Sequence, residues 1–335
     1  MNLVVISILM PAKNTSNYLA ACLDSILAQT YKNWELLVVD DHSTDHSLEL
    51  LHEYAQQDAR IQVFSNQDHG IIAALRLAYS QSKGQFITRM DSDDLMESNK
   101  LEQLQAQLEQ AGKGYLAIGQ VNYFAEGELG QGYKNYAQWL NGLTQEGQNF
   151  KEIYKECVIP SPCWMIYRED LESSRAFEPN RYPEDYDLCF RFYAQGLKIL
   201  PSASILHQWR DYGTRTSRTH EHYANNQFIA IKTHYFKQLD YDPERTLVLW
   251  GAGKRAKAIA QALLGLEVPF RWLCNNPKKI GHQIYGLLVE DIMQLNQISR
   301  PQVLVSIASP DEQSLVCQEL EKMGLIAAQD YFLFC

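Results

Sequence analysis

The sequence lacks any pairing of cysteines. Its seven cysteines are scattered and odd in number, and none forms a CxxC motif. That distribution fits neither a zinc ribbon nor a disulfide framework. We therefore expect reduced thiols, mostly buried, in a cytoplasmic protein.

Long apolar runs are also missing. The N-terminal stretch LVVISILMP has about nine residues, and no basic region precedes it. A bilayer-spanning helix needs ~20 apolar residues, and a signal peptide needs a basic start. We expect a protein that is not integral to a membrane, although peripheral contact with the inner face of a membrane is compatible with the sequence.

Positive charge is in deficit. Lysine and arginine number 30 against 40 aspartates and glutamates, which gives a formal net charge of -10. A general nucleic-acid binder needs a basic face, so nucleic acid is not an expected partner. The apolar fraction of 46% is ordinary, and 335 residues suffice for two domains.

The first half of the chain alternates between strand-like and helix-like segments. Buried strands are predicted at 4–10, 34–40, 60–66 and 84–90, each followed by a helical pattern. Such alternation indicates a parallel sheet with right-handed crossovers, whose ligands lie beyond the carboxyl ends of the strands. The polar residues at those ends are Asn14, Asp40, Asp41, Asp91 and Asp93.

The rest of the chain is less regular. A strand is predicted at 115–124, a loop at 126–149, a helix at 182–196 and a polar loop at 211–223. A linker at 237–245 then separates a domain at 1–240 from a smaller α/β domain at 245–335.

The segment QFITRMDSDDLM raises a physical question, because three carboxylates within four residues repel one another. Asp91 and Asp93 stand two residues apart after a strand, so both can face one cavity and hold Mg²⁺ or Mn²⁺ together with a diphosphate. The alternative is a solvated acidic turn that caps the next helix. The DxD spacing alone does not decide between them.

Four motifs occur in order at predicted strand ends or helix starts: ILMPAKN, LLVVDDHSTD, GQFITRMDSDD and EDYDLCFR. In this combination the chain resembles the family 2 glycosyltransferases, inverting enzymes with the GT-A fold, over roughly residues 3–220. The resemblance implies a GT-A type domain with a mixed, mainly parallel sheet, followed here by a Rossmann-like α/β domain.

The resemblance also implies roles for single residues. The nucleotide-sugar pocket would contain Pro11, Ala12, Asn14, Asp40, Asp41, Asp68, Gly70 and Asp91, with Asp41 and Asp40 at a pyrimidine base such as uracil. Mn²⁺ or Mg²⁺ would be held by Asp93 and Asp91, and the catalytic base would be Asp185, beside Glu184.

An inverting transfer needs one base on the acceptor side, and a carboxylate at a helix start suits that task. The alternative role for Glu184 and Asp185 is to complement the helix dipole. The resemblance implies that His207 can join the metal shell, as a histidine at this place does in some members of the family. The alternative is a strand-end histidine bonded to the backbone. Arg210, with further arginines at 215 and 218, forms a basic cluster suited to a diphosphate or a solvated loop.

Two positions depart from the pattern of the family. Leu75-Arg76 stands where Arg-Asn is common, and Lys100 stands where arginine is common. The first departure puts details of the sugar or nucleotide contacts in doubt.

The C-terminal domain contains GAGKRA after a predicted strand, so Gly251 and Gly253 are candidates for a second nucleotide site. An acidic residue about 20 positions on, expected for NAD, is missing. The alternatives are a plain strand–helix turn, an acceptor-positioning module or a surface for homo-oligomer formation.

The sequence thus predicts an inverting, metal-dependent transferase. It would move a sugar from a nucleotide-sugar, with UDP as carrier, to a glycan or lipid-linked acceptor in cell-surface polysaccharide biosynthesis. A non-catalytic nucleotide-sugar sensor or scaffold is the main rival. A sugar nucleotidyltransferase fits less well, because it needs a glycine-rich loop after the first strand, and PAKNTSNYL contains no glycine. An NAD-linked oxidoreductase is an alternative for the C-terminal domain alone.

Overall fold

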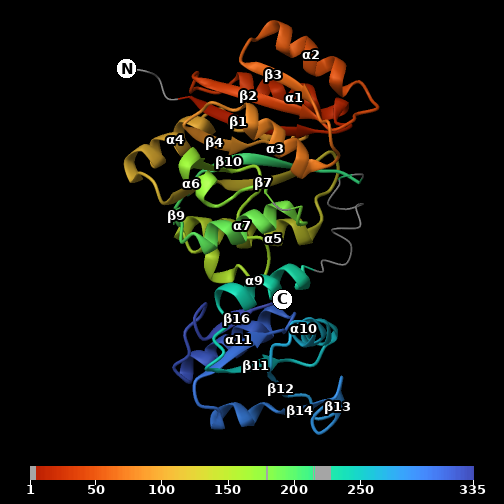
Figure 1. Ribbon diagram of the computed structural model, residues 1–335, viewed down its shortest axis with the longest axis vertical. Helices are drawn as coiled ribbons and strands as arrows, with labels where there is room; N and C mark the ends of the chain where they lie inside the picture. The colour runs from red at the N-terminus through yellow and green to blue at the C-terminus, as the bar shows by residue number, and fades with distance from the viewer. Residues whose placement is uncertain (1–4, 179, 214, 216–227) are drawn as a thin grey trace. The chain divides into compact units, whose positions relative to one another are not determined.

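The structure is a computed structural model that describes residues 5–178, 180–213, 215 and 228–335 (Figure 1). Its residues group into two compact units. The first contains the chain up to 149 and the described residues from 158 to 215. The second contains 150–157 and the described residues from 228 to the end.

The first unit is built on a seven-stranded sheet with the order β3-β2-β1-β4-β8-β6-β9. Within this sheet β8 runs antiparallel to both of its neighbours, and the other pairings are parallel. Strand β2 is buried along its whole length, as expected for an apolar run inside a parallel sheet. The strands are β1 (Ile6–Ala12), β2 (Trp34–Asp40), β3 (Ile61–Ser65), β4 (Phe86–Arg89), β6 (Tyr115–Ile118), β8 (Trp164–Tyr167) and β9 (Lys198–Leu200).

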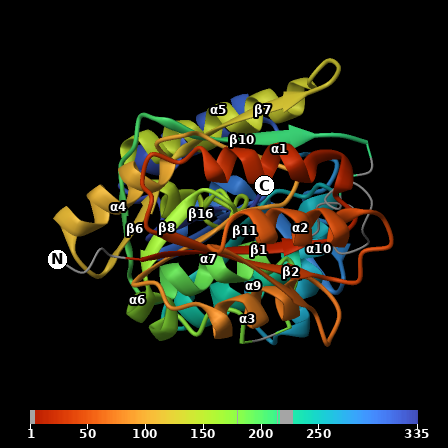
Figure 2. The same ribbon diagram turned by 90° about the horizontal axis from the view of Figure 1, so that it is seen from above.

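Helices cover both faces of this sheet. Figure 2 shows α1 and α3 on opposite sides of strands β1 and β2. Helix α1 buries Leu19, Leu23 and Ile26, the i, i+4, i+7 spacing of an amphipathic helix. The helices of this unit are α1 (Ser16–Leu27), α2 (Ser47–Gln57), α3 (Ile71–Gln81), α4 (Lys100–Ala111), α5 (Gln131–Glu146), α6 (Arg168–Ser173) and α7 (Glu184–Ala194).

A second, three-stranded sheet follows directly after the acidic turn. Its order is β5-β10-β7, with β5 (Leu95–Met96), β10 (Ile205–Asp211) and β7 (Gln120–Ala125). His207 of β10 lies opposite Met96 of β5 in an antiparallel register. The sheet therefore carries His207 and Arg210 to the acidic turn at 91–94.

The expectation of a loop at 126–149 was wrong, because helix α5 occupies most of that segment. Its glycines and asparagines have low helix propensity, which hides the pattern. Tyr136 and Trp139 nevertheless pack against the core, and Leu140 and Thr144 are buried at helical spacing. The amphipathic face is carried largely by aromatic residues.

The second unit is a six-stranded sheet with the order β13-β14-β12-β11-β15-β16. Its strands are β11 (Thr246–Trp250), β12 (Arg271–Cys274), β13 (Gln283–Ile284), β14 (Leu287–Asp291), β15 (Pro301–Val305) and β16 (Tyr331–Leu333). The helical elements of this unit are α9 (Ile229–Leu239), α10 (Lys254–Gly265), α11 (Pro310–Lys322) and the 3₁₀ turn Ile292–Gln297.

The division differs from the expected bounds of 1–240 and 245–335. Helix α9 runs into the segment 237–245 that was expected to be a linker. Tyr154 also stacks on Phe334 with ring centroids 5.2 Å apart and meets Phe236 edge-on at 5.6 Å. This aromatic cluster explains why residues 150–157 group with the C-terminal sheet.

Among the helices that the structure describes, none combines the length and apolar character needed to cross a bilayer.

Candidate functional site

The carboxyl ends of β1, β2 and β4 lie next to one another at one edge of the large sheet. Ala12 pairs with Asp40 in register, and the amide of Asp41 donates to the carbonyl of Ala12 over 2.8 Å. Met90, after β4, donates to the carbonyl of Leu9 over 3.0 Å. The parallel topology thus brings Pro11, Ala12, Asp40, Asp41 and the start of the acidic turn to one edge, where α/β sheets bind ligands.

Asp41 is the best-connected carboxylate at this edge. Its Oδ1 accepts hydrogen bonds from the Gly70 amide at 2.9 Å and from Asn66 Nδ2 at 2.7 Å. Its Oδ2 pairs with Lys13 Nζ at 3.1 Å. Burial alone would raise the pKa of Asp41, but these hydrogen bonds and the Lys13 charge together lower it. Asp41 is therefore an anionic acceptor held in a fixed position.

Asp40 offers an acceptor atom to this edge. Its Oδ2 accepts from the Ser43 amide at 3.1 Å. Its Oδ1 is buried and has no hydrogen-bond partner in the part of the chain that the structure describes. Because a buried unsatisfied oxygen is costly, it indicates a missing donor such as a ligand or an ordered water.

Asn14 and Asp68 line the same edge in different ways. Asn14 adopts a positive φ of 53° and accepts from the Thr44 amide at 2.8 Å, which ties the loop after β1 to the loop after β2. The Asp68 side chain is exposed, and its backbone carbonyl lies 2.7 Å from His42 Nε2.

Gly70 joins this pocket to the segment that precedes α7. Its φ is 92°, and a Cβ at this position would lie 2.9 Å from the Tyr182 hydroxyl. Glycine is required there by both the backbone conformation and the close approach. The loop at 66–70 thus lies close to the segment that leads to Glu184 and Asp185.

The three carboxylates of the acidic turn have three different partners. Asp91 Oδ1 accepts from Arg89 Nε at 2.9 Å, and Asp93 Oδ2 accepts from the Tyr212 hydroxyl at 2.8 Å. Asp94 is fully buried and accepts from the Arg210 amide at 2.8 Å. Asp91 and Asp93 therefore lie at the carboxyl edge of the sheet, whereas Asp94 is part of the buried hydrogen-bond network.

These environments move the pKa values apart. Burial, together with the charge of Asp94, raises the pKa of Asp93 to about 6, and burial raises the pKa of Asp94 to about 7. Burial would also raise the pKa of Asp91, but Arg89 and Arg215 outweigh it and lower that pKa. A carboxyl whose pKa is raised by neighbouring negative charge is a site that a cation would stabilise.

Arg89 links the acidic turn to the start of α7. Besides Asp91, its Nη1 lies 3.1 Å from Glu184 Oε1, and its side chain is 4% exposed. One buried guanidinium thus bridges two motifs that stand more than 90 positions apart in the chain. Arg89 was not among the residues predicted from the sequence to belong to the site. The feature that could have indicated it is a single charged residue at the end of an otherwise uncharged strand.

Asp185 lies beside this bridge. Burial first, and then the charge of Glu184, raises its pKa to about 7, although Arg89 opposes the rise. Its Oδ1 accepts from the Tyr186 amide at 2.8 Å. A carboxylate that titrates near neutral pH is suited to general-base catalysis.

His207 was a candidate metal ligand, and the structure gives its ring two hydrogen-bond partners. Both of its ring nitrogens are used: Nε2 lies 3.0 Å from Asp94 Oδ2, and Nδ1 lies 3.3 Å from Lys100 Nζ. The ring is fully buried, and burial together with Lys100 lowers its pKa well below 6.5. We infer a neutral ring that accepts from Lys100 and donates to Asp94, which leaves no lone pair for a metal.

The basic cluster lies against the acidic turn. Arg210 Nε donates to the carbonyl of Asp93 at 2.8 Å, and its guanidinium sits over the rings of Tyr18 and Phe124 at 4.7 and 4.5 Å. Arg215 Nε lies 4.0 Å from Asp93 Oδ2. Arg218 falls outside the described residues.

Arg76 has a positioning role rather than a contact with the acidic turn. Its guanidinium donates to the carbonyl of Phe177 at 2.7 Å and to Asn180 Oδ1 at 3.0 Å. It therefore holds the loop that precedes α7. Leu75, the other departure from the family pattern, is buried in the core.

Two groups of residues could hold a metal. Asp91 Oδ2 and Asp93 Oδ1 accept no hydrogen bond from the residues that the structure describes, so each carboxylate keeps an oxygen available, as hard cations require. Asp41, His42 and His69 form a second group, whose ligand atoms all lie within 4.8 Å of one another.

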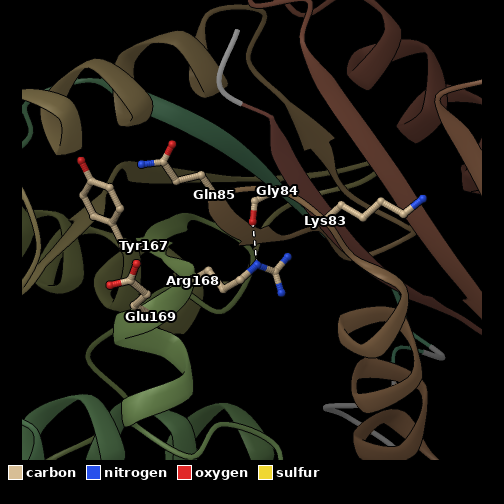
Figure 3. Close-up of a pocket in the computed structure, with 6 residues that line it drawn as sticks. All are labelled: Lys83, Gly84, Gln85, Tyr167, Arg168 and Glu169. Carbon is tan, nitrogen blue, oxygen red and sulfur yellow. Dashed lines mark hydrogen bonds between the residues drawn. The ribbon is translucent and has the colours of Figure 1, made fainter. Parts of the chain in front are cut away.

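Cavities occur at both ends of the strands. A cavity of about 340 Å³ beside the acidic turn is lined by Tyr18, Arg210 and Tyr212 among others. Another, of about 180 Å³, lies at the amino end of β4, the end away from the acidic turn. Figure 3 shows its lining, which includes Gly84 and Arg168. There Arg168 Nε donates to the Gly84 carbonyl at 2.8 Å, which indicates a structural role for that polar group.

The two glycines of the C-terminal unit differ in what they require. Gly251 has a φ of 126°, and a Cβ there would clash with Ser306 Oγ, so the backbone conformation and the close approach of the segments after β11 and β15 both favour glycine. Gly253 precedes α10 with a φ of -78°, and a Cβ there would meet nothing within 4 Å. A second nucleotide site at these glycines stays a prediction.

The large mixed sheet with ligand-facing carboxylates at its carboxyl edge defines a GT-A type transferase fold, as expected. The Staphylococcus aureus TarS structure, residues 1–349 in complex with UDP-GlcNAc, supports this assignment with a TM-score of 0.54 at 17% identity, covering 77% of this chain and 71% of that one. The family described as "Glycosyl transferase family 2" matches residues 7–175, and the chain belongs to that family.

Two curated relatives show how far the likeness extends. Glycosyltransferase GlyG of Streptococcus pneumoniae is 29% identical over 225 residues, which are 64% of this chain and 73% of GlyG. Chondroitin synthase of Pasteurella multocida is 37% identical over 98 residues, which are 29% of this chain and 10% of that enzyme.

Proposed function

We propose that the protein transfers a sugar from a UDP-sugar to a hydroxyl group with inversion at the anomeric carbon. The observation that supports this most directly is the Arg89 bridge. It couples the acidic turn at 91–93 to Glu184 and Asp185, so a donor diphosphate and an acceptor base can share one site.

Asp41 and Asp40 bind the base in this proposal. A uracil ring offers an N–H donor, and these carboxylates provide a fixed anionic acceptor and a buried oxygen without a partner. Pro11, Ala12, Asn14 and the loop with Asp68 and Gly70 line the pocket. The UDP-GlcNAc bound to TarS supports a uridine nucleotide as the carrier.

Asp91 and Asp93 would hold Mn²⁺ or Mg²⁺. When bound, the metal neutralises the charge of the departing diphosphate. Arg210 and Arg215 add positive charge beside the same turn. Arginine is suited to diphosphate because its planar fork binds phosphate oxygens in pairs.

Asp185 acts as the base. The acceptor oxygen bonds to C1 as the bond from C1 to the diphosphate oxygen breaks, and the hydroxyl proton passes to Asp185. A pKa of about 7 leaves a useful fraction of this group ionised while keeping it basic enough to take the proton. Glu184 stays paired with Arg89 and positions the start of α7.

A glycan or lipid-linked acceptor in polysaccharide biosynthesis is the part of the proposal that relies on relatives. Chondroitin synthase is by its name a polysaccharide-forming enzyme, and it shares the segment that aligns with this chain. The same proposal includes three further points: the enzyme acts at the inner face of a membrane, it forms homo-oligomers, and its C-terminal unit has an accessory role.

The test is donor turnover. Purified protein with Mn²⁺ should release UDP from one member of a UDP-sugar panel, and Asp185→Asn should reduce release by about 10²–10⁴-fold while the donor still binds. Asp187→Asn is the matched control on the same helix, where Asp187 pairs with Arg191 at 2.6 Å. Tight donor binding without turnover, with every acceptor class tried, would instead favour the sensor or scaffold.

A further inference from the structure

The group formed by Asp41, His42 and His69 lies at the nucleotide edge but is chemically different from the acidic turn. Its ligand atoms are one carboxylate oxygen and one nitrogen from each of two imidazoles, all within 4.8 Å of one another. Asp41 and His42 follow β2, and His69 comes from the loop after β3. Two loops thus contribute to one cluster.

His42 is oriented as a metal-binding histidine would be. Its Nε2 lies 2.7 Å from the carbonyl oxygen of Asp68, so this nitrogen carries the proton and Nδ1 keeps a lone pair. Histidines that bind metals commonly donate their second nitrogen to a carbonyl in this way. The residue also has a φ of 60°, a left-handed conformation that is uncommon outside glycine.

His69 completes the pair from the opposite loop. Its ring stacks on that of His42 with centroids 4.2 Å apart and an interplanar angle of 29°. Both side chains are exposed, so they can rotate without disturbing the core. Ligands around a tetrahedral ion with bonds of ~2.0–2.1 Å stand about 3.3 Å apart, so atoms that lie within 4.8 Å of one another have to move closer when the ion binds.

Asp41 is already supported as such a ligand. Asn66 and the Gly70 amide hold its Oδ1, so its Oδ2 points to Lys13 at 3.1 Å. The Lys13 side chain is 54% exposed, whereas the Asp41 side chain is 7% exposed, so the ammonium can move into water while the carboxylate stays in place. A divalent cation can therefore replace the ammonium as the partner of Asp41 Oδ2.

We propose that Asp41, His42 and His69 bind a borderline transition cation such as Zn²⁺, and that this binding excludes the nucleotide. Imidazole with carboxylate suits Zn²⁺, whereas the all-oxygen turn at 91–93 suits Mg²⁺ and Mn²⁺. The exclusion follows because the cation takes Asp41, and this clause rests on the proposed function. The site would make donor binding sensitive to zinc.

The first experiment omits nucleotide, so it does not depend on the proposed function. Zn²⁺ is titrated calorimetrically into the full chain, and Co²⁺ absorption reports the coordination. We expect one equivalent to bind in the wild type. His42→Asn and His69→Ala should each weaken Zn²⁺ binding by more than the roughly 10- to 100-fold that is typical when a residue behind a metal ligand is changed. Asparagine is chosen at position 42 because it tolerates a left-handed backbone. Exposed His52 on α2 provides the control His52→Ala, which should leave binding unchanged.

The double variant combines His42→Asn with His69→Ala. If it binds Zn²⁺ as well as the wild type does, or if the wild type binds none, the proposed zinc site is wrong. A second titration adds UDP with Mn²⁺. Zn²⁺ should weaken UDP binding in the wild type and lose that effect in the double variant. Zinc and UDP bound together at full strength would overturn the exclusion and would place the base away from Asp41.

Discussion

Replacing Asp185 with asparagine should make the protein inactive and more stable at the same time. Asparagine keeps the shape of the side chain but removes a charge that is poorly solvated and faces Glu184. The pKa of Asp185 is about 7 in the folded protein against 3.8 as its ordinary value. Since one pKa unit corresponds to about 1.4 kcal/mol, the ionised group costs the fold about 4 kcal/mol at most.

The sign of the pH dependence follows from the same values. The folded state binds the Asp185 proton more tightly than the unfolded state, so ionisation destabilises the fold. Well below pH 3.8 the carboxyl is protonated in both states, and Asp185→Asn should melt with the wild type. As pH rises to about 7 the wild type should lose stability relative to the variant, and the difference should then stay constant.

Thermal unfolding from about pH 3 to pH 8 tests this, with UDP release measured near neutral pH. Activity in the variant should fall by about 10²–10⁴-fold, the usual contribution of a general base. Asp187→Asn loses an ion pair and should be less stable yet active. An Asp185→Asn protein that is less stable than the wild type at pH 8 would refute the account of its environment.

Three further changes test other parts of the site. Arg89→Met leaves the buried Glu184 and the half-buried Asp91 without the cation that they share, so thermal or denaturant unfolding should show a loss of about 3–5 kcal/mol, and full stability would contradict the bridge. Asp41→Asn weakens a charged acceptor, so calorimetry should show UDP affinity reduced by about 10–100-fold; an unchanged affinity would move the base elsewhere. His207→Gln should lower the melting temperature yet keep the dependence of UDP binding on Mn²⁺, and loss of that dependence would restore histidine as a metal ligand.

The sequence predicted the part of the fold that depends on local patterns. Buried apolar runs and amphipathic spacings located β2 at its observed residues and the other strands nearby, and the family and GT-A fold were confirmed. Asp40, Asp41, Asp91 and Asp93 were predicted to share an edge because parallel strands place their carboxyl ends together. Their roles in binding and catalysis stay predictions.

What could not be predicted depends on contacts between distant segments. The Arg89–Glu184 pair requires β4 and α7 to meet, and no local pattern reports that. The hydrogen bonds of His207 could not be predicted either, because its partners Asp94 and Lys100 come from other elements. Helix α5 was missed because its buried face is aromatic within a stretch rich in glycine and asparagine.

The most direct test of the central claim is calorimetric titration of UDP into the purified protein, with and without Mn²⁺. The account predicts that Mn²⁺ strengthens UDP binding and that Asp93→Asn removes the enhancement, because Asp93 supplies an oxygen ligand beside the diphosphate. If UDP and the other nucleoside diphosphates fail to bind with Mn²⁺ present, the acidic turn is a helix cap and the proposed transferase site is wrong.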